Sequence, residues 1–161
     1  MRTGMLCLIQ HALPRPHLPA TKVTSRSVVS SKAQGLAERG YTFELRDRNP
    51  FDVHVYYSDD ATRERAMVMR GRMQAAFPWM RFYSPKGRPI GPHPSPMWEA
   101  DFGDASNADR WGAVVAWLEA ERNGLSVLVH PHSTDGGYAD HTRHAFWAGE
   151  PLKLKISQPE S

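Results

Sequence analysis

The sequence predicts an α+β fold of the ferredoxin-like type, in which the order βαββαβ gives a four-stranded antiparallel sheet with two helices on one face. Three observations lead to this prediction. Four short segments alternate apolar and polar residues, which is the period of strands. Two longer segments repeat apolar residues at helical spacing. Clusters of Pro, Gly and Asn punctuate the chain between several of these segments.

The 161 residues, of which 40% are hydrophobic, are enough for one domain. We expect that domain at residues 49–157. Residues 1–48 are predicted to form a disordered or weakly structured extension, because they lack sustained periodicity and their first 37 residues contain no acidic side chain. Such composition is also typical of organelle transit peptides and of a translated leader ahead of a wrongly assigned start.

Charge, cysteine and hydropathy exclude several classes of protein. The extension holds 8 basic and 3 acidic residues and the rest of the chain holds 12 and 14, so the domain has no basic surface for nucleic acid. No apolar run is long enough to span a membrane. A single cysteine, Cys7, fits a reducing compartment, so we expect a cytoplasmic protein unless the extension targets it to an organelle.

The first strand and first helix come directly after the extension. Residues 51–57 alternate an apolar set with a polar set that includes His54. Helix N-caps are available at Ser58, Asp59 and Asp60. Helical spacing then continues until Pro78, through Ala66, Met69, Met73 and Phe77.

The second and third strands are predicted at residues 81–84 and 97–102, joined by a connection rich in Pro and Gly. In the third strand the aromatic residues alternate with polar ones. Burial of the aromatic side therefore places Glu99 and Asp101 on the opposite face.

The second helix is amphipathic, is expected to be capped near Ser106 or Asn107, and ends at Asn123-Gly124. Its apolar positions are Trp111, Val114, Val115 and Leu118. A fourth strand at residues 125–130 carries His130 at its end.

In the usual strand order of this fold, 4-1-3-2, the start of the first strand lies beside the ends of the third and fourth. His54 is therefore expected near His130, and near Glu99 or Asp101, on the face that the helices leave open. Two imidazoles and a carboxylate form the ligand set of a non-haem Fe(II) site. We accordingly predict His54, His130 and Glu99 as metal ligands.

A single strand histidine is more often structural than a ligand, so the prediction depends on convergence. The domain has six histidines: His54, His93, His130, His132, His141 and His144. The predicted fold brings at least two of them to one surface. Pro131 favours an extended, oriented His130, while His132 is as readily a polar strand end. His93 is held between two prolines, and Asp140-His141 can fold back toward the site.

Four separated motifs resemble the DOPA 4,5-dioxygenase family, in the family's order and over about residues 50–154. They are FDVHVYY at 51–57, GPHP with MWE at 91–99, LSVLVHP at 125–131 and DHT at 140–142 with the following Ala145, Trp147 and Gly149-Glu150. The resemblance implies extradiol cleavage of a catechol such as DOPA with Fe(II) and dioxygen. It implies ligand positions at His54 and His130, and a third ligand or acid/base groups at His93 and His141.

One departure from the family affects the ligand set. A histidine often precedes the first-strand histidine by two residues, and here that position is Asp52.

Two other functions fit the same fold: a dimeric, non-enzymatic ligand-binding module, and a cofactor-free monooxygenase or isomerase. For all of them we expect a homodimer, because Tyr56, Met97 and Leu128 would otherwise form an exposed apolar patch on the open face.

Overall fold

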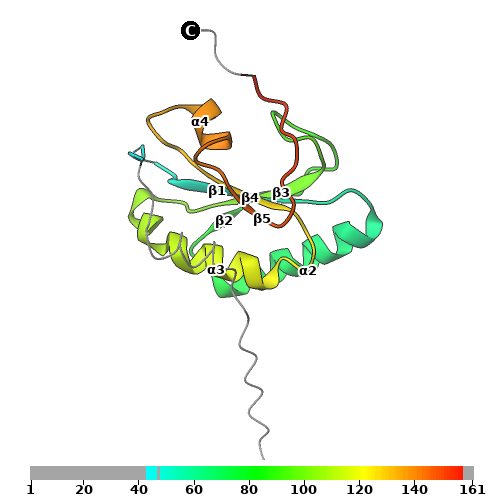
Figure 1. Cartoon of the computed structure of the whole chain (residues 1–161). Coiled ribbons are helices and arrows are strands. Elements are labelled where there is room, and N and C mark those ends of the chain that lie inside the picture. Colours follow the sequence, from blue (N-terminus) through cyan, green and yellow to red (C-terminus); the bar gives the residue numbers. More distant parts are fainter. Residues whose placement is uncertain (1–42, 47, 158–161) are drawn as a thin grey trace, which may run out of the picture.

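A computed structural model describes residues 43–157 with the exception of residue 47, so most of the predicted extension lies outside the described residues (Figure 1). Its elements in chain order are β1 Phe51–Tyr56, α2 Asp60–Ala76, β2 Arg81–Phe82, β3 Met97–Asp101, the 3₁₀ helix η1 Ala105–Arg110, α3 Trp111–Glu121, β4 Val127–Pro131, α4 Gly137–His141 and β5 Phe146–Ala148.

The sheet has five strands in the order β2-β3-β1-β4-β5, and every pair is antiparallel. As expected, β1 lies between β3 and β4. The prediction of four strands is wrong, because β5 adds to the outer edge of β4. That strand has only three residues, which is too short for alternation to be recognised in the sequence.

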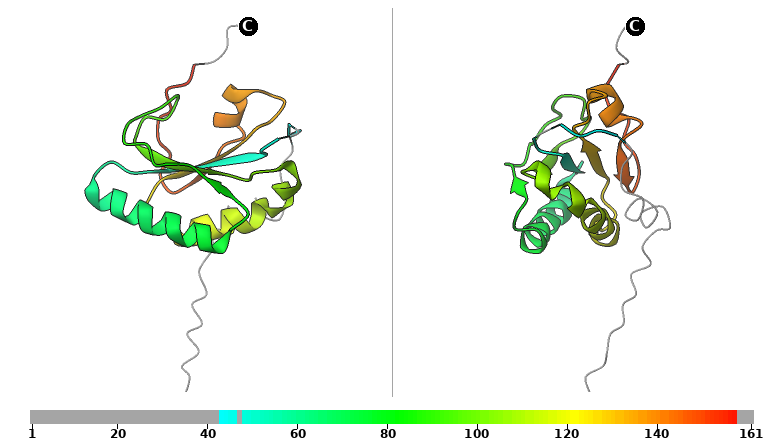
Figure 2. Two further views of the ribbon diagram at one scale, coloured as in Figure 1. Left: turned by 180° about the vertical axis from the view of Figure 1, so that it is seen from behind. Right: turned by 90° about the vertical axis from the view of Figure 1, so that its left-hand side faces the viewer.

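Helices α2 and α3 lie together on one face of the sheet, whereas α4 and the C-terminal segment lie on the other (Figures 1 and 2). The apolar set of β1 faces the two helices and forms the main core with their buried residues. Its fully buried members on the three central strands and α3 include Trp98, Phe51, Leu118, Val53 and Val55. The polar set of β1 consequently points to the face of α4.

The helix boundaries follow local capping. Asp59 is the N-cap of α2 and forms a capping box with Thr62. The predicted cap of the second helix at Ser106 or Asn107 is wrong. Instead, Asp104 caps η1, which leads directly into α3. After α3 the backbone turns through left-handed Asn123 and Gly124, with φ of 47° and 77°, as the sequence predicts.

The face opposite the helices is covered by the chain itself, so the prediction of an exposed apolar patch there is wrong. Tyr56, Met97 and Leu128 are only 3%, 2% and 0% exposed. The residues that pack over them come from the segment after α4: Ala145, Trp147, Leu152 and Leu154. This packing removes the surface from which a homodimer was predicted.

Residues 43–46 pack against the domain just ahead of β1. Leu45 forms a bridge with Ser133, and the amide of Arg46 donates to the carbonyl of His132 at 2.9 Å. Leu45 and Phe43 also contact the core. Among the described helices, none is long and apolar enough to cross a membrane.

Candidate metal centre

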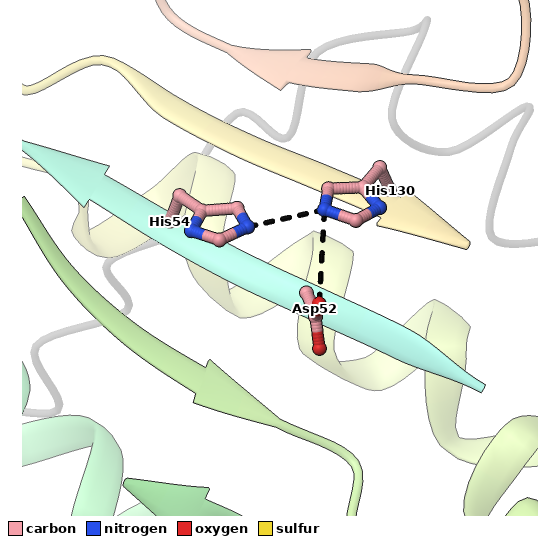
Figure 3. A group of neighbouring side chains, drawn as sticks. All are labelled: Asp52, His54 and His130. Atoms are coloured by element: carbon pink, nitrogen blue, oxygen red, sulfur yellow. Dashed lines mark hydrogen bonds and ion pairs between the residues drawn. The ribbon is translucent and has the colours of Figure 1, made fainter. Parts of the chain in front are cut away.

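The candidate site lies where the start of β1 meets the end of β4. In the register, Asp52 pairs with His130 across β1 and β4, and His54 pairs with Glu99 across β1 and β3. Because paired residues and those two apart share a face, these four side chains lie on the face away from α2 and α3. Figure 3 shows Asp52 and His54 on one strand and His130 on its neighbour.

Asp52, His54 and His130 are buried, and one ligand atom from each lies within 4.8 Å of the others. The two Nε2 atoms of His54 and His130 are 3.1 Å apart, and Asp52 Oδ2 is 3.8 Å from Nε2 of His130. Two imidazoles bound at right angles to one metal, with bonds of about 2.1 Å, would have nitrogens about 3.0 Å apart. The donor set therefore fits a divalent transition metal.

Both imidazoles are neutral at physiological pH, as metal ligation requires. Burial, followed by the charge of His130, holds the pKa of His54 well below its ordinary value. Burial, followed by the charge of His141, lowers the pKa of His130 to about 3. Protonation of either ring would place a positive charge in the poorly solvated interior.

The backbone fixes the tautomer of His130. Its Nδ1 lies 3.0 Å from the carbonyl oxygen of Pro131. A carbonyl only accepts hydrogen bonds, so Nδ1 carries the proton and the lone pair is on Nε2, which faces the group. The buried Nδ1 of His54, by contrast, has no hydrogen-bond partner among the described residues.

Asp52 is held from two sides, by the side chains of Asn49 and His132. His132 Nε2 donates to Asp52 Oδ2 at 2.9 Å, and this hydrogen bond raises the pKa of His132. Burial alone would raise the pKa of Asp52, but the hydrogen bond from His132 and the electrostatic interaction with the nearby rings of His130 and His132 bring it below its ordinary value. Asp52 is therefore an ionised carboxylate, and His132 orients it.

A cavity of ≈ 280 Å³ opens over the group, lined further by His93, His141, Glu99, Ile90 and Met97. His93 and His141 face the predicted ligands closely. The ring of His93 lies 4.1 Å from that of His54, and the ring of His141 lies 4.0 Å from that of His130. The cavity is therefore lined by five imidazoles, and four of them come from the motifs identified in the sequence: His54, His93, His130 and His141.

His93 and His141 each use Nδ1 inside the protein. His93 Nδ1 is 2.7 Å from the hydroxyl of Tyr56, and His141 Nδ1 is 2.8 Å from the carbonyl of Gly137. Burial, followed by the charge of His141, lowers the pKa of His93 to about 4.

The two carboxylates offered by the third strand have different surroundings. Glu99 lines the cavity opposite His54 but lies outside the group of three. Burial, followed by the charges of Asp52 and Asp101, raises the pKa of Glu99. Asp101 accepts two hydrogen bonds from Arg81, both at 2.8 Å, and another from Tyr83.

Asp52 is the member of the group that the predicted ligand set omits. Strand alternation contains the signal for it, since Asp52 is two residues before His54 and shares its face. His144, by contrast, lies away from the cavity and bonds to Asp135 at 2.7 Å.

Comparisons with known proteins show the family of the chain. The model of the Dopa 4,5-dioxygenase family matches residues 51–158. An uncharacterised 21.2 kDa protein of Botryotinia fuckeliana is 37% identical over 119 residues, which are 68% of this chain and 63% of that protein. The chain thus spans less than two thirds of that relative's length.

A crystal structure from Nostoc punctiforme, described as that of a candidate dioxygenase, is similar with a TM-score of 0.58 and 34% identity. The match covers 67% of this chain and 88% of the Nostoc chain.

Proposed function

The chain belongs to the Dopa 4,5-dioxygenase family, and we propose that it is an extradiol ring-cleaving dioxygenase that opens catechols such as DOPA with non-haem Fe(II) and dioxygen. The observation that supports the proposal best is the buried group of Asp52, His54 and His130 beneath a cavity. Two neutral imidazoles and one carboxylate are the ligands of non-haem iron oxygenases, and they leave positions open for substrate and dioxygen.

In this reaction the ring C–C bond beside the diol breaks, and both atoms of dioxygen enter the product as an aldehyde and a carboxylate oxygen. Fe(II), when bound, would supply the Lewis acidity and redox chemistry that allow the diol to react with dioxygen. His54 and His130 would hold it together with a carboxylate. Asp52 is the carboxylate that the geometry favours, and Glu99, opposite His54, is the one that the sequence predicts.

The remaining histidines of the cavity would handle protons. A catechol must lose a proton as it binds, and the ring that opens must be protonated again, so an acid and a base are needed within reach of the diol. His93 and His141 line the cavity and are the candidates for these roles. The cavity volume of ≈ 280 Å³ is at the small end of ligand pockets, which suits a substrate with one ring.

The test is to measure iron in freshly purified protein together with catechol-dependent oxygen uptake. We expect one iron per chain after anaerobic loading with Fe(II), and one dioxygen consumed per DOPA cleaved. Protein that binds no iron under these conditions would contradict the proposal and favour the ligand-binding module. Oxygen uptake by metal-free protein would instead favour a cofactor-free oxygenase.

The homodimer and the cytoplasmic location remain predictions. With Tyr56, Met97 and Leu128 covered within the chain, a dimer would need another surface.

A further inference from the structure

The hydroxyl of Tyr56 forms a hydrogen bond with His93, next to the group of Asp52, His54 and His130. Tyr56 belongs to the polar set of β1, is 3% exposed, and its hydroxyl lies 2.7 Å from Nδ1 of His93. No other hydrogen-bond partner for this hydroxyl is found in the described part of the chain. His93 is also buried, and its backbone N–H donates a hydrogen bond to the carbonyl of Ile90 at 3.1 Å, which holds it in its loop.

The direction of this hydrogen bond follows from what each group must satisfy. A buried phenol O–H that donates to nothing leaves an unpaired donor in the interior, which is costly. If His93 donated from Nδ1, the proton of Tyr56 would need a second acceptor, and His93 is its one partner among the described residues. Tyr56 therefore donates to Nδ1.

The direction of this hydrogen bond determines the protonation of the other ring nitrogen of His93, Nε2. A neutral imidazole carries one proton, so an acceptor Nδ1 requires N–H at Nε2. His130 and His141 have the opposite arrangement, because the carbonyls of Pro131 and Gly137 accept from Nδ1 and leave lone pairs on Nε2. Of these three rings that line the cavity, His93 is the one whose remaining nitrogen is a donor.

We propose that Tyr56 is a positioning residue that holds His93 in the Nε2–H tautomer, so that His93 acts as a hydrogen-bond donor in the cavity and not as a metal ligand or base. This assignment of roles rests on the proposed function. Within it, His93 donates to an anionic oxygen of the bound substrate, while His141, with its lone pair on Nε2, accepts the catechol proton.

The tautomer can be measured without any turnover. Two-bond proton–nitrogen correlation spectra of metal-free, ¹⁵N-labelled protein distinguish protonated from unprotonated ring nitrogens, and His93→Gln assigns the His93 signals by their loss. We expect Nε2 of His93 to be protonated and Nδ1 to be unprotonated. Protonation at Nδ1 would overturn the proposal, whatever the enzyme does with catechols.

The variant Tyr56→Phe tests the positioning role. It removes the hydroxyl but keeps the ring that stacks on Trp147 at 5.7 Å. A matched control is Tyr57→Phe, because the neighbouring hydroxyl donates to the carbonyl of Lys86 at 2.8 Å on the other face of the strand. Both variants lose one buried tyrosine hydrogen bond, and only the first one changes His93.

We expect Tyr56→Phe to keep its bound iron and its KM for catechol but to lose about tenfold in kcat, as expected when a hydrogen-bond donor to negative charge that grows in the transition state is misplaced. Tyr57→Phe should keep all three within about twofold. An equal kcat in the two variants, or loss of iron in Tyr56→Phe or His93→Ala, would overturn the proposal. Inactive wild-type protein with His93 in the Nε2–H tautomer would refute the proposed function alone.

Discussion

Five imidazole rings line one cavity, and the centroids of His130 and His141 are only 4.0 Å apart. Rings packed this closely cannot all be protonated, because like charges in a poorly solvated site repel each other strongly. The neutral rings of His130 and His141 instead present lone pairs on Nε2 to a common space. At the scale of single residues, the crowding itself therefore favours a cation between His54 and His130. Which ring nitrogen carries the proton then decides whether a histidine can act as a metal ligand, an acid or a base.

The ligand residues should separate iron binding from folding. Replacement of His54 or His130 by Ala removes a neutral nitrogen donor, so we expect loss of bound Fe(II) and of oxygen uptake, measured by metal analysis and an oxygen electrode. The melting temperature of the metal-free protein should change little, since neither ring belongs to the core packed on the helices. Val115→Ala on α3 is the opposite control, expected to cost about 2 kcal/mol of stability and to keep iron.

The carboxylate ligand can be identified in the same experiment. Asp52→Asn keeps the shape of the side chain and removes the charge, and we expect it to weaken iron binding at least tenfold. Glu99→Gln, which changes the carboxylate opposite His54, should retain iron. The reverse result would restore the ligand set that the sequence predicts, with Glu99 as the third ligand.

At the scale of elements, β1 determines the site because it is the central strand and supplies two of the three grouped side chains. Its alternation can be read directly from the sequence, which is why His54, His130 and their common face were predictable. Asp52 shares that alternation, but the choice among Asp52, Glu99 and Asp101 depends on side-chain partners such as Arg81 and His132. Those partners come from other strands and carry no periodic signal.

The segment after α4 was not predictable as a cover for the sheet. Residues 145–154 contribute one strand of three residues and single apolar contacts, so neither period of 2 nor of 3.6 extends far enough to be recognised. The closure of the second face depends on tertiary contacts alone.

Gly149, directly after β5, is expected to be essential for this closure. Its φ is 86°, and a Cβ there would lie 2.8 Å from the carbonyl oxygen of Leu125 and 2.7 Å from Nη1 of Arg122. Gly149→Ala should therefore destabilise the protein by more than about 1 kcal/mol, measured by thermal or urea unfolding.

Gly71→Ala is the matched control, because Gly71 is exposed in α2 and a Cβ there meets nothing within 4 Å. It should stabilise the protein by about 0.5–1 kcal/mol. Equal effects of the two substitutions would mean that the turn at Gly149 tolerates a side chain.

At the scale of the whole molecule, the domain extends a few residues further toward the N-terminus than the predicted boundary at residue 49. Phe43 and Leu45 pack on the core, and the segment pairs with residues 132–134. The ring of Phe43 also lies 4.4 Å from that of His144. Residues 43–46, called the bracing segment below, therefore stabilise the end of β4, which carries His130.

Two truncated proteins would measure this contribution. A chain that begins at residue 43 and one that begins at residue 47 differ only in the bracing segment, so the difference in their melting temperatures reports its packing and hydrogen bonds. We expect the shorter protein to melt several degrees lower, which corresponds to a loss of about 1–2 kcal/mol in the free energy of unfolding. Identical melting temperatures would show that residues 43–46 add nothing to stability.

The hydrogen bond from the amide of Lys155 to the carbonyl of Pro92, at 2.7 Å, has a consequence for biosynthesis. The loop that carries His93 is tied to a segment more than 60 residues later in the chain. Ribosomes release a protein from its N-terminus onward, so β1, β3 and β4 can emerge and pair while this tie does not yet exist. The hydrogen bond that ties the loop of His93 to the C-terminal segment therefore forms only after residue 155 has been synthesised and released from the ribosome.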